Sequence, residues 1–314
     1  MNLQTVLNLE KPSFSIDYRM RMMMIGSCFV ENIGSKLDYF KFQTVINPCG
    51  IVYNPISVAE TLNLLLDRKP LNESELMQNN GKWVSLKHHG KFSSVSKEEC
   101  LTGINRRLTE DADWLEQTDL LVLTWGTAWV YRHILTDQVV SNCHRFPAAD
   151  FERYRLSVDE IVEIYVDLFK RLWQMRPDMK IILTVSPVRH WKDGAHGNQL
   201  SKAVLLLAVE RLCEQFKDIY YFPAYELVMD ELRDYRFYAE DMVHLSNQAV
   251  TYIWEKFQSS FIASSTQEWM QKIERCNKLL AHRPFDENSE STKELYLRTQ
   301  NELKEILDKL YAEL

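Results

Sequence analysis

The chain has 314 residues, of which 46% are hydrophobic, and its net charge is −7 at pH 7. This length predicts one large domain with an extension, or two domains, and the apolar content is ordinary for a globular protein. The acidic balance and the lack of a basic stripe argue against a nucleic-acid surface, and no run of 18 apolar residues is present that could span a membrane.

Strand-like and helix-like segments alternate through most of the chain. Short apolar runs predict buried strands at residues 21–25, 42–46, 119–124, 180–185 and 219–222. Helical spacing predicts helices at residues 29–40, 55–66, 157–175, 199–216 and 245–262, the last capped by Ser246. Strands separated by helices predict a three-layer α/β/α sandwich with a mainly parallel, flavodoxin-like sheet.

Two insertions and a C-terminal extension interrupt this alternation. Residues 81–95 and 131–146 predict β-hairpins, the second turning near residues 136–137, which either wall a pocket or decorate the fold. Residues 267–281 and 292–314 predict helices separated by a break at 282–291. We therefore divide the chain into a domain at 1–264 and a helical extension at 265–314. The apolar stripe of the last helix packs either on its own chain or in a homodimer.

The cysteines and the first residues bear on localisation. The six cysteines are far apart, at positions 28, 49, 100, 143, 213 and 276, without a C-x-x-C pair. This spacing favours reduced thiols over a disulfide framework or a zinc site. Residues 1–18 contain no long apolar run, so we expect no secretory signal and a cytoplasmic protein.

Two short segments suggest catalytic chemistry. Ser27 follows the first predicted strand, where a turn exposes a hydroxyl at the carboxyl edge of the sheet. Asp241 and His244 stand before the last helix of the main domain, at a spacing that lets both side chains leave one turn. A serine becomes nucleophilic when a histidine takes its proton, and a carboxylate orients that histidine. The three residues are therefore a candidate catalytic triad, although each segment alone is also an ordinary helix cap.

The chain order Ser…Asp…His, with Asp three residues before His, resembles that of SGNH (GDSL-type) hydrolases. The segment 26–30, Gly-Ser-Cys-Phe-Val, resembles more narrowly the signature that names the GSCFA family, whose fifth position is usually Ala. Further segments between about residues 20 and 262 match the style of this family, at 47–50, 53–55, 184–188, 222–226 and 237–238. The resemblance implies the SGNH fold and a bacterial serine hydrolase without a cofactor, and it leaves the substrate open.

The same resemblance implies an oxyanion hole. It assigns the backbone amide of Ser27 and those of Gly50 and Gly126, which follow the second and third strands. SGNH enzymes add an Asn side chain two residues after the last glycine, where this chain has Ala128. Losing one such donor typically costs about 10²–10³ in rate, so a substitute is needed. Candidates are the hydroxyl of Thr127 and the side chains of Asn54 and Asn198.

The segment 186–198 is unusually polar for a loop at the expected active-site edge. It places Arg189, His190 and His196 there, either to bind an anionic or sugar-like group or as a solvated lid without a ligand. With Asn54 and Thr127, these are the candidate substrate-binding residues. The spacing offers no H-x₃-H pattern or acidic pair, so we predict no metal site.

A cysteine next to the candidate nucleophile leaves a second interpretation open. Cys28 stands near a helix N-terminus, where a thiolate is stabilised, so it is either a nucleophile or a packing residue. We expect a hydrolase that cleaves an acyl ester, such as an O-acetyl group on a carbohydrate, through Ser27. An acyltransferase with the same triad, or a carbohydrate- or partner-binding module that has lost catalysis, would share these features.

Overall fold

A five-stranded parallel sheet forms the centre of the computed structural model, which describes residues 5–282 and 289–312. Its strands are β1 (Arg21–Gly26), β2 (Gln43–Ile46), β5 (Leu120–Trp125), β9 (Lys180–Val185) and β10 (Ile219–Tyr221). Their order across the sheet is β10-β9-β5-β1-β2. With these strands numbered along the chain, this is the 2-1-3-4-5 order of flavodoxin-like folds, and the predicted fold class is confirmed.

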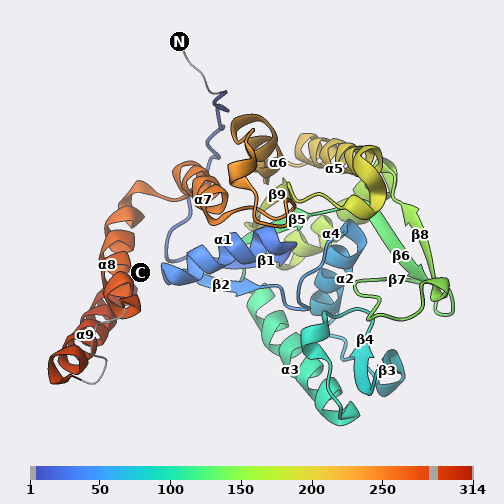
Figure 1. Cartoon of the computed structure of the whole chain (residues 1–314), viewed down its shortest axis with the longest axis horizontal. Coiled ribbons are helices and arrows are strands. Elements are labelled where there is room, and N and C mark those ends of the chain that lie inside the picture. The colour runs from blue at the N-terminus through green and yellow to red at the C-terminus, as the bar shows by residue number, and fades with distance from the viewer. Residues whose placement is uncertain (1–4, 283–288, 313–314) are drawn as a thin grey trace.

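Side chains alternate along the strands and divide the core into two halves. In β1, Met23 and Ile25 join one buried cluster, whereas Met22 and Met24 join the other. Four helices cover the first face: α2 (Pro55–Leu66), α3 (Lys97–Leu115), α4 (Val158–Met175) and α5 (Gly194–Gln215). The second face is covered by α1 (Cys28–Tyr39), the short α6 (Ala224–Glu226) and α7 (Asn247–Phe261) (Figure 1). This arrangement makes three layers.

The predicted strands and helices of this core are confirmed, and the short helix α6 is an addition that was not predicted. Helix α5 begins at Gly194 rather than at residue 199. Helix α3 was not predicted, because charged residues surround the narrow buried stripe of Cys100, Ile104 and Leu108. Ser96 caps this helix by accepting a hydrogen bond from the backbone N–H of Glu99, a start signal that the sequence did contain.

The first hairpin spans residues 76–85, earlier than the predicted 81–95, and within the predicted range the described chain also pairs antiparallel at the bridge between Trp83 and Ser94. Strands β3 (Leu76–Asn79) and β4 (Lys82–Ser85) pair antiparallel and turn at Asn80 and Gly81. Both turn residues have positive φ, 49° and 74°. That is the geometry of a type I′ turn, for which Asn-Gly is the preferred sequence. The turn dipeptide, and not the alternation after it, determines the register.

The second hairpin is confirmed and gains a strand. Strands β6 (Trp129–His133) and β7 (Gln138–Val140) pair antiparallel across the predicted turn. Strand β8 (Phe151–Arg155) adds to the other side of β6, in the order β7-β6-β8. This small sheet begins directly after β5, at the carboxyl edge of the central sheet.

Helices α8 (Gln267–Ala281) and α9 (Glu290–Ala312) form an arm that extends from the α/β domain (Figure 1). Most of the predicted break at 282–291 lies outside the described residues. On α9, Ile306 and Leu310 are buried in the cluster that continues into the second face of the sheet. Leu295, on the same predicted stripe, is 50% exposed. Part of the stripe therefore packs on its own chain, and a homodimer through this arm stays a prediction.

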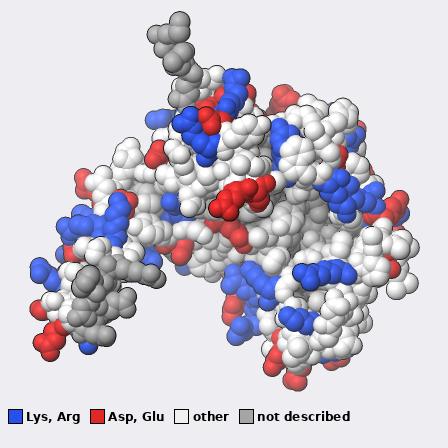
Figure 2. All heavy atoms as spheres, in the orientation of Figure 1, with Lys and Arg blue, Asp and Glu red and all other residues white. Residues whose placement is uncertain are grey.

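The surface agrees with the charge pattern of the sequence. On the face in Figure 2, basic and acidic side chains are interspersed.

Within residues 5–282 and 289–312, no helix has the length and apolar character needed to cross a membrane. All six cysteines, each in the described part of the chain, are unpaired. A cytoplasmic location stays a prediction.

Candidate active site

The turn after β1 is built around Gly26. Its φ is 150°, and a Cβ added there would lie 2.3 Å from the carbonyl oxygen of Thr124 on the neighbouring strand β5. Its N–H donates to Oδ1 of Asn47, after β2, at 2.9 Å. Only glycine lets the chain leave β1 so close to β5, and the turn then delivers Ser27 to the carboxyl edge of the sheet.

We expect Gly26→Ala to destabilise the protein by at least about 2 kcal/mol, because the new methyl group meets backbone and the φ is strained. Gly103→Ala in α3 is the matched control, because a Cβ there meets no atom within 4 Å. That change should stabilise the protein by roughly 0.5–1 kcal/mol. Urea denaturation measures both. A Gly26→Ala variant as stable as the wild type would contradict this account of the turn.

Ser27 is 2% exposed and caps helix α1. Its Oγ accepts a long hydrogen bond, 3.4 Å, from the backbone N–H of Phe29. Among the described contacts, no hydrogen bond joins Ser27 to His244. The cap interpretation of Ser27 is therefore correct, and it does not compete with catalysis, because catalytic hydrogen bonds often form fully only when substrate is bound.

Asp241 and His244 form the hydrogen-bonded pair that their spacing predicts. Nδ1 of His244 lies 2.5 Å from Oδ2 of Asp241, and Oδ1 of Asp241 accepts the backbone N–H groups of Val243 and His244 at 2.9 Å. The hydrogen bond from His244 lowers the pKa of Asp241 to about 2. The carboxylate therefore stays ionised, and Nε2 of His244 is left to exchange a proton with a partner.

A pocket of about 180 Å³ brings His244 to the nucleophile turn. His244 and Cys28 both line it, whereas Ser27, one residue earlier, does not. Its walls are otherwise mainly apolar: Phe29, Ile33, Pro187, Val188, Leu245, Val250 and Ile253. Burial, followed by the charge of Glu31, raises the pKa of the Cys28 thiol. Cys28 thus shares a pocket with the histidine, but its raised pKa favours the thiol, the less nucleophilic form.

Two of the three predicted oxyanion donors are occupied. The N–H of Gly50 donates to the carbonyl of Asn47 at 2.8 Å, and that of Gly126 to the carbonyl of Tyr53 at 2.7 Å. Each glycine therefore donates to an oxyanion only if the substrate displaces the carbonyl that it now binds. The described contacts give the amide of Ser27 no such partner.

The candidates for a replacement of the missing Asn also differ. Asn54 uses both ends of its side chain to cap α2. The hydroxyl of Thr127 lies 3.1 Å from a serine hydroxyl of α5. Asn198 accepts the N–H of His190 at Oδ1, while its buried Nδ2 has no partner among the described residues. Of the three, Asn198 has side-chain N–H groups to spare.

Of the predicted substrate-binding residues after β9, His190 and Arg189 lie in the loop, whereas His196 lies in helix α5. The His190 ring packs edge-on against Tyr53, with centroids 5.9 Å apart. Burial, followed by the charge of Lys202, lowers the pKa of His190 to about 4, so this imidazole is neutral. Arg189 contacts Sδ of Met229 at 3.5 Å and lines a neighbouring hollow. His196 is exposed at the start of α5, and the structure does not bring it to the others.

Lys202 is a residue at this site that sequence reasoning missed. Its side chain is 0% exposed, and Nζ donates to the carbonyl oxygens of Gly126 and Ser186. The spacing of polar residues in the sequence could have indicated it. Asn198, Ser201 and Lys202 stand at i, i+3 and i+4, which places three polar side chains on the inward face of a helix. Such a face is normally apolar.

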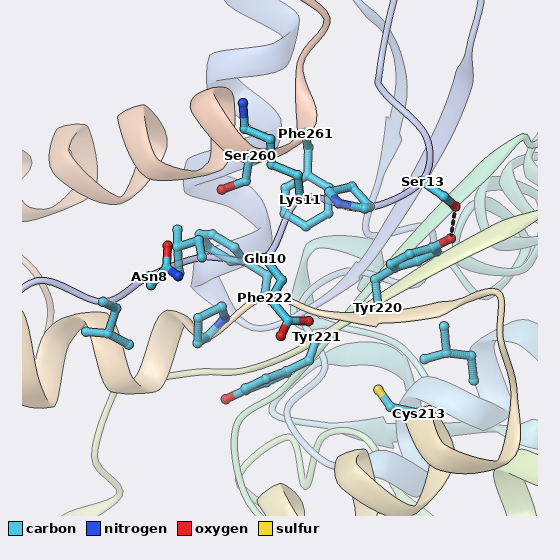
Figure 3. Close-up of a pocket in the computed structure, with 15 residues that line it drawn as sticks. Asn8, Glu10, Lys11, Ser13, Cys213, Tyr220, Tyr221, Phe222, Ser260 and Phe261 are labelled. Carbon is cyan, nitrogen blue, oxygen red and sulfur yellow. Dashed lines mark hydrogen bonds between the residues drawn. The ribbon is translucent and has the colours of Figure 1, made fainter.

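Another hollow, of about 550 Å³, lies between the N-terminal segment and β10 (Figure 3). The hydroxyl groups of Ser13 and Tyr220 lie 2.7 Å apart there and tie the segment to the strand. None of the predicted catalytic or binding residues lines it. Nor do the described residues contain a cluster of three or more His, Cys, Asp or Glu that could hold a metal ion.

Comparisons with known proteins give one family and several distant structural relatives. A model of the GSCFA family matches residues 21–257. No curated protein matches the sequence. Among solved structures, the family 3 carbohydrate esterase of Clostridium thermocellum is 11% identical, with 80% of this chain and 97% of that chain covered and a TM-score of 0.37.

Two further structures are similarly distant. An acetyl xylan esterase from the rumen bacterium Butyrivibrio proteoclasticus is 10% identical, with 81% and 66% of the two chains covered and a TM-score of 0.41. A Bacteroides fragilis protein proposed to be an acylhydrolase is 14% identical, with 84% and 92% covered and a TM-score of 0.38. A function for this chain therefore has to rest on its own side chains.

Proposed function

The chain belongs to the GSCFA family, and from the geometry of its site we propose that it is an SGNH-type ester hydrolase with Ser27 as the nucleophile. The observation that carries the proposal is the Asp241–His244 hydrogen bond, whose histidine shares a pocket with Cys28, the residue next to Ser27. A carboxylate-oriented imidazole beside a hydroxyl at a strand-to-helix turn is an arrangement suited to acyl transfer.

The proposed reaction has two halves. Oγ of Ser27 attacks the ester carbonyl while Nε2 of His244 takes its proton, and the same proton then passes to the departing alcohol. Water next attacks the acyl-serine, again giving its proton to Nε2, and the acid leaves as the Ser27 hydroxyl re-forms. Asp241 holds the imidazole through Nδ1 and stabilises its protonated form in both halves.

The developing oxyanion needs donors near Ser27. The donors that the described contacts leave without a partner include the amide of Ser27 and the buried Nδ2 atoms of Asn47 and Asn198. Asn47 is at the nucleophile turn, because its Oδ1 accepts the N–H of Gly26. Gly50 and Gly126 join them if the substrate displaces the carbonyls of Asn47 and Tyr53. In this proposal the hole is completed by substrate binding, which predicts lower activity than a preformed hole gives.

The size of the pocket at His244 suggests an acyl group. A cavity of about 150 Å³ lined by aliphatic and aromatic residues holds benzene, a six-carbon ring, and this pocket measures about 180 Å³. We propose that it takes acyl groups from acetyl to about six carbons. The alcohol part, a carbohydrate in our proposal, would lie toward Arg189 and His190 on the neighbouring loop.

Hydrolysis of p-nitrophenyl esters tests both parts of this proposal. We expect acetate to hexanoate to be hydrolysed, and decanoate to be hydrolysed at least about tenfold more slowly because its chain overfills the pocket. Val250→Phe, which narrows the pocket, should depress hexanoate more than acetate. A fluorophosphonate probe should label the protein on Ser27.

Two results would contradict the assignment as an ester hydrolase. Acyl transfer to an added alcohol in preference to water would show an acyltransferase with the same triad. A wild-type protein that neither hydrolyses any ester nor reacts with the probe would refute catalysis and favour a binding module. The occupied amides of Gly50 and Gly126, and the lack of a Ser27–His244 hydrogen bond among the described contacts, would then support the binding module.

A further inference from the structure

Lys202 is a buried lysine without a carboxylate partner among the described residues. The side chain is 0% exposed, and among the described residues no carboxylate lies within ion-pair distance of Nζ. Instead Nζ donates to the carbonyl oxygen of Gly126 at 2.6 Å and to that of Ser186. Gly126 follows β5 and Ser186 follows β9, so one ammonium group bridges two loops at the edge of the sheet. A buried charge that is not paired is costly, so its presence calls for a role.

The first turns of α5 hold these same loops at other points. Oγ of Ser201 accepts the N–H of Ala128 at 2.8 Å, and Oδ1 of Asn198 accepts the N–H of His190 at 3.0 Å. Together with Lys202, these side chains form a polar face that we call the α5 clamp. The later turns of the same helix face are apolar. The clamp therefore serves the loops and not the packing of the helix.

The charge of Lys202 also acts at the nucleophile turn. It lowers the pKa of the Cys28 thiol, against the larger effects of burial and Glu31, which raise it. Burial, followed by the charge of Arg189, lowers the pKa of Lys202 itself to about 7, while Cys28 raises it. Lys202 is thus close enough to residues 27–28 for negative charge there to favour its protonated form.

We propose that Lys202 is a positioning residue for the ester hydrolysis proposed above, on which this inference rests. Its ammonium group holds the backbone at Gly126 and Ser186 in place beside Ser27. The same charge stabilises the oxyanion that forms at the turn, without touching the substrate. The clamp explains how two loops without regular structure keep one geometry at the site.

Kinetics of Lys202→Met test the proposal. We expect kcat for p-nitrophenyl acetate to fall about 10- to 100-fold, because a prepositioned charge and two loop contacts are lost. KM should change little, because the buried Nζ cannot reach the substrate. Lys202→Gln keeps an N–H donor without the charge and should recover part of the loss. Lys180→Met is the matched control: it removes a lysine paired to Asp218 at the opposite edge of the sheet and should leave kcat unchanged.

A second readout does not depend on esterase activity. The rate at which iodoacetamide alkylates Cys28, followed by peptide mass spectrometry at pH 6.5, below the pKa of about 7 of Lys202, should fall about three- to tenfold in Lys202→Met and Lys202→Gln as the thiolate becomes rarer. The difference between wild type and variants should shrink at pH 9, where Lys202 is neutral. Cys143 in the same sample is the internal control, because the lysine that acts on its pKa is Lys192.

Each outcome decides the matter. A folded Lys202→Met with kcat within twofold of the wild type, or with its loss in KM alone, would overturn the proposal. If Lys202→Met does not fold, Lys202→Gln with wild-type kcat and wild-type Cys28 alkylation overturns it equally. If the wild type itself hydrolyses no ester, the proposed function fails, and slower Cys28 alkylation in the variants would still show that the Lys202 charge acts at this turn.

Discussion

Replacing Ser27 by Ala is expected to lower kcat for p-nitrophenyl acetate by about 10⁴- to 10⁶-fold and to abolish labelling by a fluorophosphonate probe. The reason is that no other described hydroxyl stands at the turn between β1 and α1. The change should be structurally mild, because Ser27 makes a single long cap bond to Phe29. Losing such a cap costs about 1 kcal/mol, so the variant should remain folded.

Cys28→Ala is the matched control for this prediction. Because Cys28 lines the pocket of His244 and Ser27 does not, the cysteine is the specific competitor for the role of nucleophile. Its raised thiol pKa argues against it, and we expect Cys28→Ala to keep both hydrolysis and labelling. The reverse pattern, loss in Cys28→Ala with activity retained in Ser27→Ala, would move the nucleophile by one residue and refute the assignment made here.

His244→Ala should have an effect of similar size, and the double variant Ser27→Ala/His244→Ala should be no worse than either single change. Residues that act as one unit are not additive, because removing the base already disables the nucleophile. Steady-state kinetics of the two single variants and the double variant measure this. Additive losses would show that His244 does not act through Ser27.

Two further substitutions test the roles of Asp241 and His244. Asp241→Asn should cost about 10²–10³ in kcat, less than for a triad whose carboxylate is buried, because water reaches this pair; the side chains of Asp241 and His244 are 51% and 57% exposed. His196→Ala is the matched histidine control, because His196 is exposed at the start of α5. It should leave kcat unchanged. A loss of kcat as large as that in His244→Ala would contradict the assignment of His244 as the general base.

Much of the fold follows from local pattern. The strands β1, β5 and β9 are continuous apolar runs because both faces of a parallel sheet are covered, and such runs are short and bounded enough to be recognised. The Asp241–His244 hydrogen bond could also be predicted from the sequence, because two residues three positions apart on one turn can bond without contacts from the rest of the chain. Helix α3 escaped prediction because its inward stripe is narrow and its other positions are charged.

What the sequence by itself determined is therefore the order of strands and helices, the place of the nucleophile turn and the Asp–His pair. Only the tertiary structure decided how the loops at the carboxyl edge meet. The amides of Gly50 and Gly126 are occupied by carbonyls of Asn47 and Tyr53, and Lys202 joins the loop at Ser186 to the loop at Gly126, which is far from it in sequence. Periodicity reports which side of an element is buried, whereas these bonds join backbone atoms whose proximity exists only once the strand ends lie side by side.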